Sequence, residues 1–566
     1  MWKIINLRRL YRQFLLIFIG LILIVMPAVA QEEDQPYSEQ VDIIAPYQPS
    51  IDDARKINMT PELKVQEPQK RTLEYNITPQ KIPVEVELDD MQPVRFQSGT
   101  KETLKSNYIR GGGGNVKTAY GELFTTSRQS QEHRIGLHLK HLSHGGDVQD
   151  YATAQNSQNL AEVFGEKYYK NSSLYARAFY DRNTLHRYGF KPANYTETYA
   201  DDDIRQRFTT LGANIRYENL DKKRDEFDYK LNLGYYYWED NYQSLENAVN
   251  LNFFAAQPSE MFGAIDYQSF AIKGDFNFFN SGDSLNAINT IDLNITPFFE
   301  IENGFYRLKA GATLSAAMSD EQDTELTAFP YAEARIHMVP GYLSLSGAVS
   351  GKKMHQSFGQ LSSKNPFIKS DISKEFTTHK INAFGALSGN IARGVDFNIK
   401  VSYLETGNFP LFVTDYSQTF ENQFEIAYDD VSRLTYGGSL SVKVSERFLL
   451  DAALKMNDYT TTLEDRAWHL PELEIESSVS YSPAMKMPLN FRLKATSLNG
   501  RVARDSSGNI VELDDIFDLG FEVLYEHTSS LGLFLEINNL LSQEQTLWNQ
   551  YPSYGINALA GVSYSF

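Results

Sequence analysis

A strict two-residue alternation runs through residues 306–316, which read YRLKAGATLSA. Tyr, Leu and Ala occupy the even-numbered positions, and Arg, Lys, Gly, Thr and Ser occupy the odd-numbered ones. Because successive side chains of a β-strand point to opposite faces, the pattern predicts a strand with one apolar and one polar face. Such a strand suits either a half-buried soluble sheet or the wall of a membrane barrel.

The same alternation recurs from about residue 104 to the C-terminus, most clearly at 395–403, 434–444 and 489–496. The composition is aromatic-rich, at 13%, while only 42% of residues are hydrophobic and the mean hydropathy is negative. A helical membrane protein would show repeated apolar runs, and the only long one lies at the N-terminus. Alternating strands with aromatic girdles are typical of membrane β-barrels.

The spacing of the turns separates a membrane barrel from a soluble sheet. Short connections are expected at 221–224, 302–304, 340–341, 393–394, 445–447 and 528–530. They alternate with long polar stretches near 145–160, 190–202, 356–377, 407–431, 459–468 and 501–512. Outer-membrane barrels have short periplasmic turns and longer outer loops. We therefore predict that residues 96–566 form an all-β, antiparallel transmembrane barrel of about 22 strands in a Gram-negative outer membrane, surrounded by its lipid.

Charge and motifs narrow the function. The net charge of −19 disfavours nucleic-acid binding, which needs a basic patch. No cysteine is present, which excludes disulfides and thiolate metal sites. The sequence lacks HExxH, GxSxG and a phosphate-binding glycine loop, and Gly111–Gly114 is interpreted as a strand turn. We expect no cofactor and no enzyme activity.

Residues 1–30 are predicted to be a signal peptide. Four basic residues precede the apolar run Phe14 to Met26, and the small residues Ala28 and Ala30 follow it, which favours cleavage after Ala30. The alternative is an uncleaved anchor, although the run is shorter than a membrane span. Removing this leader makes the mature chain still more acidic.

Residues 31–95 form a separate segment that contains eight of the 20 prolines, with 14 acidic against seven basic residues. This composition predicts an acidic, extended periplasmic linker. Within it, Ile82–Leu88 alternates apolar with charged or proline residues. Proline confines such a piece to the edge of a sheet, where it could add to a partner.

The C-terminal segment carries a family resemblance. In the last strand Ile556, Ala558, Ala560, Val562, Tyr564 and Phe566 share one face. The terminal aromatic resembles the signal that the outer-membrane assembly machinery recognises, which assigns that role to Val562, Tyr564 and Phe566. The longer segment INNLLSQEQTLWNQYPSYGINALAGVSYSF, 537–566, resembles the final hairpin of TonB-dependent receptor barrels. The predicted strand count extends the resemblance loosely over the barrel.

The chain also departs from that family. TonB-dependent receptors carry a folded plug of well over a hundred residues, whereas residues 31–95 leave room for no full plug. The stretch VDIIAPYQP, 41–49, resembles that of Bacteroidota barrel proteins grouped with these receptors. By this resemblance Val41, Asp42, Ile43, Ile44 and Ala45 would pair by β-addition with a TonB-type or other periplasmic partner. The alternative is an N-terminus that docks on the barrel mouth.

Basic residues are predicted on the lumen face of several strands: Arg307, Lys309, Lys400, Lys443, Lys455, Arg492 and Lys494. They would favour anionic solutes, hold the acidic segment, or simply pair with neighbouring carboxylates. Two acidic clusters, Asp201–Asp203 and Asp429–Asp430, offer oxygen ligands for Ca²⁺ or are solvated loop charges. His138 and His141 belong to a histidine-rich strand but point to opposite faces, which disfavours a metal site.

Two classes of function remain open. The first is a pore or transport barrel that resembles TonB-dependent receptors, and it includes TonB-coupled uptake with a separately encoded plug. The second is a non-conducting envelope scaffold or assembly subunit that binds a periplasmic partner through residues 31–95.

Overall fold

The computed structural model describes residues 105–566, apart from 128–129, 131, 221–224, 264, 283–286 and 485–487. The predictions made for the signal peptide, for residues 31–95 and for Val41–Ala45 lie outside these residues. Within the described part, 22 strands form one sheet.

The first eleven strands of this sheet are β1 (Asn107–Gly114), β2 (Thr118–Thr126), β3 (His133–His144), β4 (Asn156–Tyr168), β5 (Ser172–His186), β6 (Arg205–Asn219), β7 (Asp228–Asp240), β8 (Leu245–Pro258), β9 (Tyr267–Gly282), β10 (Ala287–Glu302) and β11 (Tyr306–Ser319). The other eleven are β12 (Glu325–Val339), β13 (Leu343–His355), β14 (Phe376–Ala392), β15 (Val395–Thr414), β16 (Phe424–Ser445), β17 (Phe448–Thr461), β18 (Leu473–Tyr481), β19 (Leu489–Asn499), β22 (Ile516–Glu526), β23 (Leu531–Asn538) and β26 (Asn557–Ser565).

Smaller elements lie in the connections: η1 (Pro192–Asn194), α2 (Asp201–Ile204), α3 (Phe358–Lys364), and the hairpins β20 (Val502–Arg504) with β21 (Ile510–Glu512) and β24 (Thr546–Trp548) with β25 (Tyr551–Pro552). Among the described residues, no helix is long and apolar enough to span a membrane.

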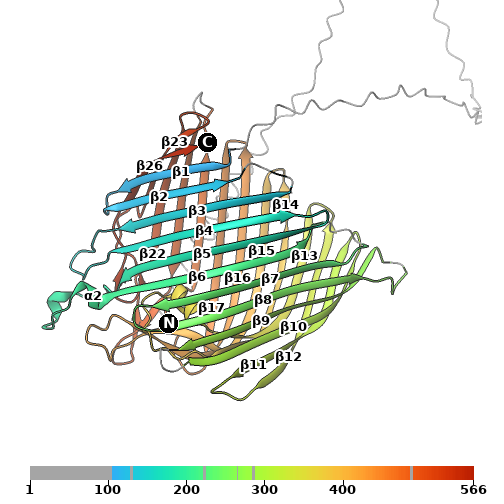
Figure 1. The fold of residues 1–566 in the computed structure, drawn as a ribbon, viewed down its shortest axis with the longest axis horizontal. Coiled ribbons are helices and arrows are strands. Elements are labelled where there is room, and N and C mark those ends of the chain that lie inside the picture. The colour runs from blue at the N-terminus through green and yellow to red at the C-terminus, as the bar shows by residue number, and fades with distance from the viewer. Residues whose placement is uncertain are drawn as a thin grey trace, which may run out of the picture. The chain divides into compact units, whose positions relative to one another are not determined.

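Each strand of the large sheet pairs antiparallel with its neighbours in the chain, and β1 also pairs with β26, so the sheet closes on itself (Figure 1). The prediction of an all-β, closed antiparallel barrel with about 22 strands is confirmed. A closed barrel satisfies every backbone group between strands, which is the condition for crossing lipid with strands.

The alternation that predicted the strands sets their faces. Leu314, Leu211 and Ile399 are each at least half exposed although they are apolar, because they point away from the lumen. In soluble proteins this much exposed aliphatic surface would be a liability, whereas lipid covers it in a membrane barrel. The molecule is an outer-membrane β-barrel.

The two ends of the barrel differ as the turn spacing predicted. Both Lys105 and the C-terminal Phe566 lie at the end with short turns, where Lys105 donates a hydrogen bond to Ser530 Oγ at 2.6 Å. This end carries a ring of exposed aromatic residues: Tyr169, Phe227, Phe262, Phe305, Tyr342, Tyr481 and Phe566. The short turns identify it as the periplasmic end, and the aromatic residues mark the membrane interface there.

At the opposite, outer end lie the long connections 145–155, 187–204, 356–375, 415–423, 462–472, 500–515 and 539–556. The predicted loop at 407–431 is wrong in its bounds, because β15 runs to Thr414 and β16 starts at Phe424. With 20 and 22 residues these two strands exceed what a tilted crossing needs and continue beyond the membrane.

The four glycines Gly111–Gly114 are not a turn, as the sequence suggested, but half of strand β1 at the closing seam. A Cβ on Gly112 would lie 2.6 Å from the carbonyl oxygen of Ala560, and one on Gly114 would lie 2.3 Å from that of Ala558. Because backbone atoms occupy that space, the seam requires residues without a side chain.

Candidate functional site in the barrel lumen

The outer end of β13 leaves the wall and crosses the inner face of β10. The side chain of Asn294 donates a hydrogen bond to the carbonyl oxygen of Lys353 at 2.9 Å, and Asp292 accepts one from the backbone N–H of His355 at 3.0 Å. Asn294 and Asp292 are buried, and each of their hydrogen bonds satisfies a polar group of the incoming strand. The connection 356–375 therefore starts inside the lumen.

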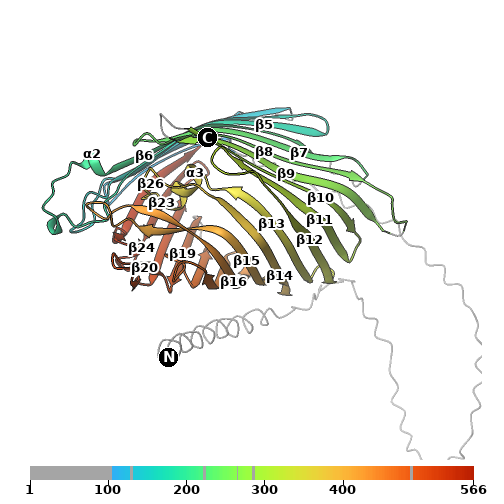
Figure 2. The same ribbon diagram turned by 90° about the horizontal axis from the view of Figure 1, so that it is seen from below.

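Helix α3 follows at once, lies inside the barrel (Figure 2) and packs on the inner wall at β7 and β8. Its N-cap Ser357 accepts a hydrogen bond from Gln360 N, which forms a capping box. Glu246 of β8, fully buried, accepts from the backbone N–H of Phe358 at 2.9 Å. Phe358 also stacks on Trp238. A carboxylate at the helix start and an apolar contact thus fix α3 to β7 and β8.

Beyond α3, this connection meets chain segments from several parts of the barrel in one apolar core. The core comprises Leu185, Phe208, Trp238, Phe358, Leu361, Ile368, Ile372, Phe412, Phe424 and Tyr551. Strands β5 to β7 contribute to it from one side, and β15 and β16 contribute from the other side of the ring. We call the connections 187–204, 356–375, 415–423 and 539–556 the loop cap.

The outer ends of β15 and β16 are buried on both faces. Phe412 and Phe424 belong to the core just described. Leu411 and Val413 point to the other side of the hairpin, where they pack in a second core around Trp468. In an ordinary barrel one face of such strands is exposed to solvent, whereas protein covers both faces of these two strand ends. This hairpin tip is therefore an internal part of the loop cap.

Polar contacts join opposite walls through the same cap. Asn422, which follows β15, donates a hydrogen bond to the carbonyl oxygen of Arg187 at 2.5 Å, and Arg187 donates to that of Ile368 at 3.0 Å. β5 and β16 are half the ring apart, so these bonds span the mouth. Burial lowers the pKa of Arg187, and its guanidinium lies 4.6 Å from the ring of Tyr242, a cation–π contact.

Tyr551 lies at the centre of the cap. Its hydroxyl donates to the carbonyl oxygen of Asn422, and its ring stacks on Phe367 with centroids 3.6 Å apart. Burial raises its pKa well above the usual value, so the phenol stays neutral. The ring of Tyr188 packs edge-on against Tyr551 at 5.0 Å. Three other connections of the loop cap therefore converge on this one side chain.

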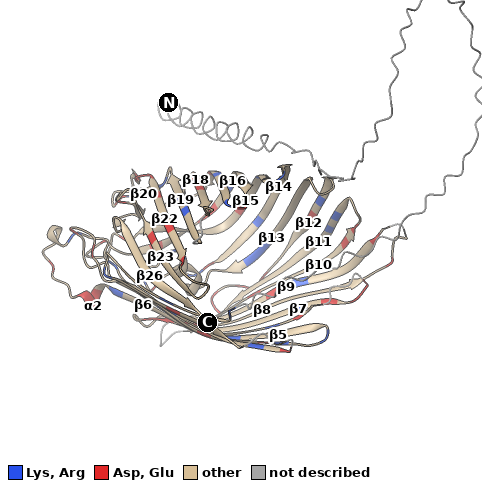
Figure 3. Ribbon diagram, turned by 90° about the horizontal axis from the view of Figure 1, so that it is seen from above, with Lys and Arg blue, Asp and Glu red and all other residues tan. Residues whose placement is uncertain are grey.

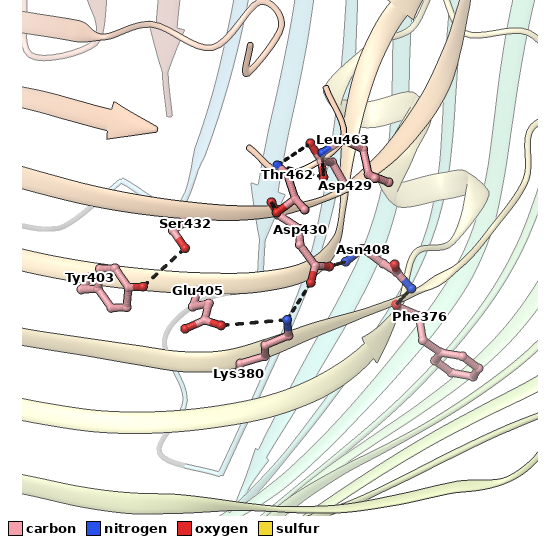
Figure 4. Close-up of polar contacts among 10 residues, drawn as sticks. All are labelled: Phe376, Lys380, Tyr403, Glu405, Asn408, Asp429, Asp430, Ser432, Thr462 and Leu463. Carbon is pink, nitrogen blue, oxygen red and sulfur yellow. Dashed lines mark hydrogen bonds and ion pairs between the residues drawn. The ribbon is translucent and has the colours of Figure 1, made fainter. Parts of the chain in front are cut away.

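At the bend where β15 leaves the wall, a bulge after Thr406 is tied down by Asp430 (Figure 4). Asp430 accepts hydrogen bonds from Asn408 N at 3.1 Å and from Lys380 Nζ at 2.7 Å. Asn408 has a positive φ of 52°, and its amide reaches the carbonyl oxygen of Phe376. These contacts fix the direction in which the hairpin tip continues.

Its neighbour Asp429 points the other way and anchors connection 462–472. Its carboxylate accepts hydrogen bonds from the backbone N–H groups of Thr462, Leu463 and Glu464, each between 2.9 and 3.2 Å. The side chain is buried. The calcium interpretation of Asp429–Asp430 therefore gives way to a structural role, since both carboxylates already hold donors of the chain.

His469 links this connection to the cap. Its Nδ1 lies 3.0 Å from the carbonyl oxygen of Phe412, and its Nε2 accepts from Asn549 N at 3.3 Å. An acceptor nitrogen requires the neutral ring with the proton on Nδ1. Burial lowers the pKa of His469 to about 4, in agreement with that pattern.

The predicted lumen residues Arg307, Lys309 and Lys443 all have carboxylate partners. Arg307 pairs with Glu302, Lys309 with Glu333 at 3.1 Å, and Lys443 with Glu446 at 2.8 Å. Charged residues are scattered along the strands rather than gathered into one basic band (Figure 3). Of the three interpretations, local pairing describes these residues.

Of the four remaining predicted residues, two pair with carboxylates and two make other contacts. Lys494 pairs with Glu522, and Lys455 pairs with Glu474 at 3.2 Å. Lys400 lies 4.4 Å from the ring of Phe384, and Arg492 donates to Ser480 Oγ at 3.1 Å.

Sequence reasoning missed Lys273 and Lys352, which lie on the inner wall beside His379. Lys273 shares the inner face with Asp275, so the alternation of β9 contained its signal. The approach of His379 to Lys352 depends on a bulge in β14 between His379 and Ile381, which no local pattern reveals.

The other candidates are placed apart. Asp201–Asp203 form α2, where Asp202 pairs with Arg205 at 2.8 Å. His138 contacts Glu122 at 2.8 Å, whereas His141 contacts Asn159 on the other face. The described residues contain no group of three or more potential metal ligands. Val562, Tyr564 and Phe566 all point outward and are exposed.

Comparison with known proteins identifies the fold. No protein-family model matches the sequence, and no curated protein matches it. Solved structures do match: the ferric-catecholate import receptor Fiu of E. coli K12 (TM-score 0.60, 10% identity) and the FrpB iron transporter of Neisseria meningitidis (0.62, 9%) each align over 82% of both chains. The copper transporter OprC (0.56, 13%) aligns over 82% of this chain and 81% of its own.

At this level of identity the similarity is one of fold. It confirms the expected resemblance to the barrels of TonB-dependent receptors in architecture. In the described residues, packed loops cross the outer mouth of the lumen.

Proposed function

We propose that this protein is a gated transport barrel that passes a solute across the outer membrane through its lumen, with the loop cap as the outer gate. The observation that carries the proposal is the hydrogen bond from Asn422 to Arg187, which joins opposite sides of the mouth above a polar lumen wall. A scaffold needs neither a charged inner wall nor a lid across it.

The named functions of the structural neighbours agree with this reading. Each is described as an import receptor or a transporter, for iron or for copper. Barrels of 22 strands are wide enough to need a plug or a closed mouth to keep the membrane sealed. Here the loop cap supplies such a closure.

The chain contains no cysteine, so a reversible cross-link tests the gate cleanly. Ser244 Oγ donates to the carbonyl oxygen of Ser370 at 2.8 Å, so the two residues are neighbours, and we choose them as the cysteine pair. We expect the Ser244→Cys/Ser370→Cys variant to be silent in planar bilayers when oxidised and to open when reduced. Ser244→Cys alone is the matched control and should ignore oxidant.

A variant with residues 358–372 replaced by a short Gly-Ser linker tests conduction itself. We expect large, steady openings from this protein, with the barrel shown to be folded by heat-modifiable gel migration. Silence from the folded, shortened protein would refute the transport proposal and leave the alternative, a non-conducting scaffold that binds a periplasmic partner.

We further propose that the part of the chain ahead of the barrel works in the periplasm. The chain enters β1 from the short-turn end, which supports a periplasmic place for residues 31–95 after cleavage between Ala30 and the next residue. Val41–Ala45 would pair with a TonB-type or another periplasmic protein by β-addition. Unchanged growth on every solute after deletion of residues 31–50 would count against TonB coupling.

A further inference from the structure

We propose that a recess in the inner wall, between β8 and β14, binds a small hydroxylated anion of the sugar-acid or sugar-phosphate kind. This deepens the proposed function, on which it rests, by naming a class of solute. The recess has a volume of about 380 Å³, which lies within the range of small-molecule sites.

Two lysines in this recess lack an acidic partner. Lys273 Nζ lies 3.9 Å from the ring centroid of Tyr331. Neither Lys273 nor Lys352 has a carboxylate within ion-pair distance among the described residues, in contrast to Lys309 and Lys353 nearby. Two lysines without carboxylate partners that face one cavity attract anions.

The carboxylates around the recess are already engaged. Asp275 accepts a hydrogen bond from Asn294 at 2.8 Å, and Glu333 is held by Lys309 and by the hydroxyl of Tyr331 at 2.6 Å. Asp275 also lines the recess, and with Glu333 it offsets part of the charge of Lys273. With two lysines and one carboxylate in its lining, the recess still carries net positive charge.

His379 strengthens the site. It lies opposite Lys352 in the pairing of β13 with β14, next to a bulge that turns it into the recess. With Lys273 and Lys352 it supplies a third nitrogen donor. Three donors from three strands make a fork that suits a carboxylate or phosphate group.

The rest of the lining suits hydroxyl groups. Amides and hydroxyls surround the cations: Asn252, Asn294, Asn382, Thr296, Thr313 and Ser350. Tyr331 adds an aromatic surface. A polyol can form hydrogen bonds with such donors and acceptors and pack against the aromatic ring. A bare inorganic ion would leave most of these groups without a contact.

Calorimetric titration of the full-length protein in detergent at low salt tests this inference, with sodium glucuronate, glucose 6-phosphate, glucose and inorganic phosphate as probes. We expect glucuronate or glucose 6-phosphate to bind, and glucose and phosphate to bind at least about tenfold more weakly. Lys273→Gln and Lys352→Gln should each weaken binding about tenfold, as the loss of one charge-assisted contact predicts. Lys455→Gln removes an ion-paired lumen lysine and should leave binding unchanged.

The two acidic probes separate a carboxylate site from a phosphate site, and either outcome supports the inference. Equal binding of glucose, or of phosphate alone, would overturn it, as would unaltered binding by both lysine variants. The titration does not depend on conduction. If the shortened-cap variant conducts but the full-length protein binds none of the probes, the recess inference is rejected and the transport proposal stands.

Discussion

The ring of Phe367 stacks on the ring of Tyr551 with centroids 3.6 Å apart, so connection 356–375 rests on connection 539–556 over the mouth of the barrel. The two residues come from parts of the chain that are far apart in sequence. Their contact is the centre of the core that makes the outer end of this barrel a lid.

Truncation of Tyr551 should loosen the lid without opening the barrel wall. Tyr551→Ala removes a fully packed ring, and such changes cost about 3–5 kcal/mol. We expect hydrogen exchange to accelerate throughout 356–375 and to stay slow in the barrel strands. Tyr551→Phe loses only the bond to Asn422 and should cost about 1 kcal/mol. Tyr342→Ala, on an exposed aromatic at the periplasmic end, is the control.

Replacement of Asp429 by asparagine should release connection 462–472. The amide nitrogen would face backbone N–H groups that now donate to a carboxylate, and a hydrogen bond to a charged group contributes about 1.5–3 kcal/mol. Amides 462–464 should therefore exchange about tenfold to a hundredfold faster. Asp430→Asn breaks a half-exposed ion pair with Lys380 and should leave those amides protected.

The lid should weaken at acidic pH because His469 is buried neutral. Its pKa is about 4 in the closed cap against about 6.5 when exposed, so the open form binds a proton first. Closure is therefore insensitive to pH above about 6.5 and loses about 1.4 kcal/mol per unit as the pH falls toward 4. Hydrogen exchange of 462–472 from pH 7 to 4, corrected for the intrinsic rate, measures this slope. His469→Gln should flatten it, and an equal slope in that variant would contradict the assignment.

A side chain at the seam should weaken closure of the barrel. Gly114→Ala places a Cβ 2.3 Å from the carbonyl oxygen of Ala558, a clash with backbone that cannot rotate away. Overpacking of this kind costs about 1–3 kcal/mol, and we expect a lower melting temperature and loss of the compact band in unheated gels. Gly121→Ala, on the adjacent strand with nothing within 4 Å of the new Cβ, should behave as wild type.

The terminal aromatic should matter for assembly rather than for stability. Phe566 is 54% exposed and is held to the first strand through backbone contacts with Asn107, which a smaller side chain retains. We expect Phe566→Ser to reduce the amount of barrel in the outer membrane while the protein that is inserted melts normally. Equal amounts of inserted wild type and variant would refute the assembly signal. Phe305→Ser tests whether loss of any exposed aromatic has the same effect.

The sequence predicted the wall well because the wall is a local property. A residue such as Leu314 faces lipid because its neighbours Thr313 and Ser315 face inward, and two-residue periodicity makes that readable without a structure. The lengths of the connections identified the periplasmic end, and the strand count followed from the periodicity and the connection lengths together. Prediction failed at Gly111–Gly114, where glycines suggested a turn but closure required strands in close contact.

Most of the candidate site could not be predicted from the sequence. The predicted basic residues do lie on strands, but Lys309 has Glu333 directly opposite, and Lys494 reaches Glu522 diagonally across the strand pair, so neighbouring strands cancel their charge. Register also explains why Lys352 has no carboxylate partner among the described residues, because the residue opposite it on β14 is His379. Register between strands depends on bulges, and a single extra residue exchanges inward and outward faces.

The sequence by itself determined that this chain is a closed β-barrel, which strand faces meet lipid, and at which end the long connections lie. These follow from the covalent geometry of each strand, whose side chains must alternate. Only the tertiary structure decided that the mouth is covered, that Arg187 meets Asn422, and that Lys273 and Lys352 share a recess. Each of these depends on contacts between segments that closure of the barrel brings together. Such contacts do not change the two-residue periodicity within a strand, so the sequence pattern does not reveal them.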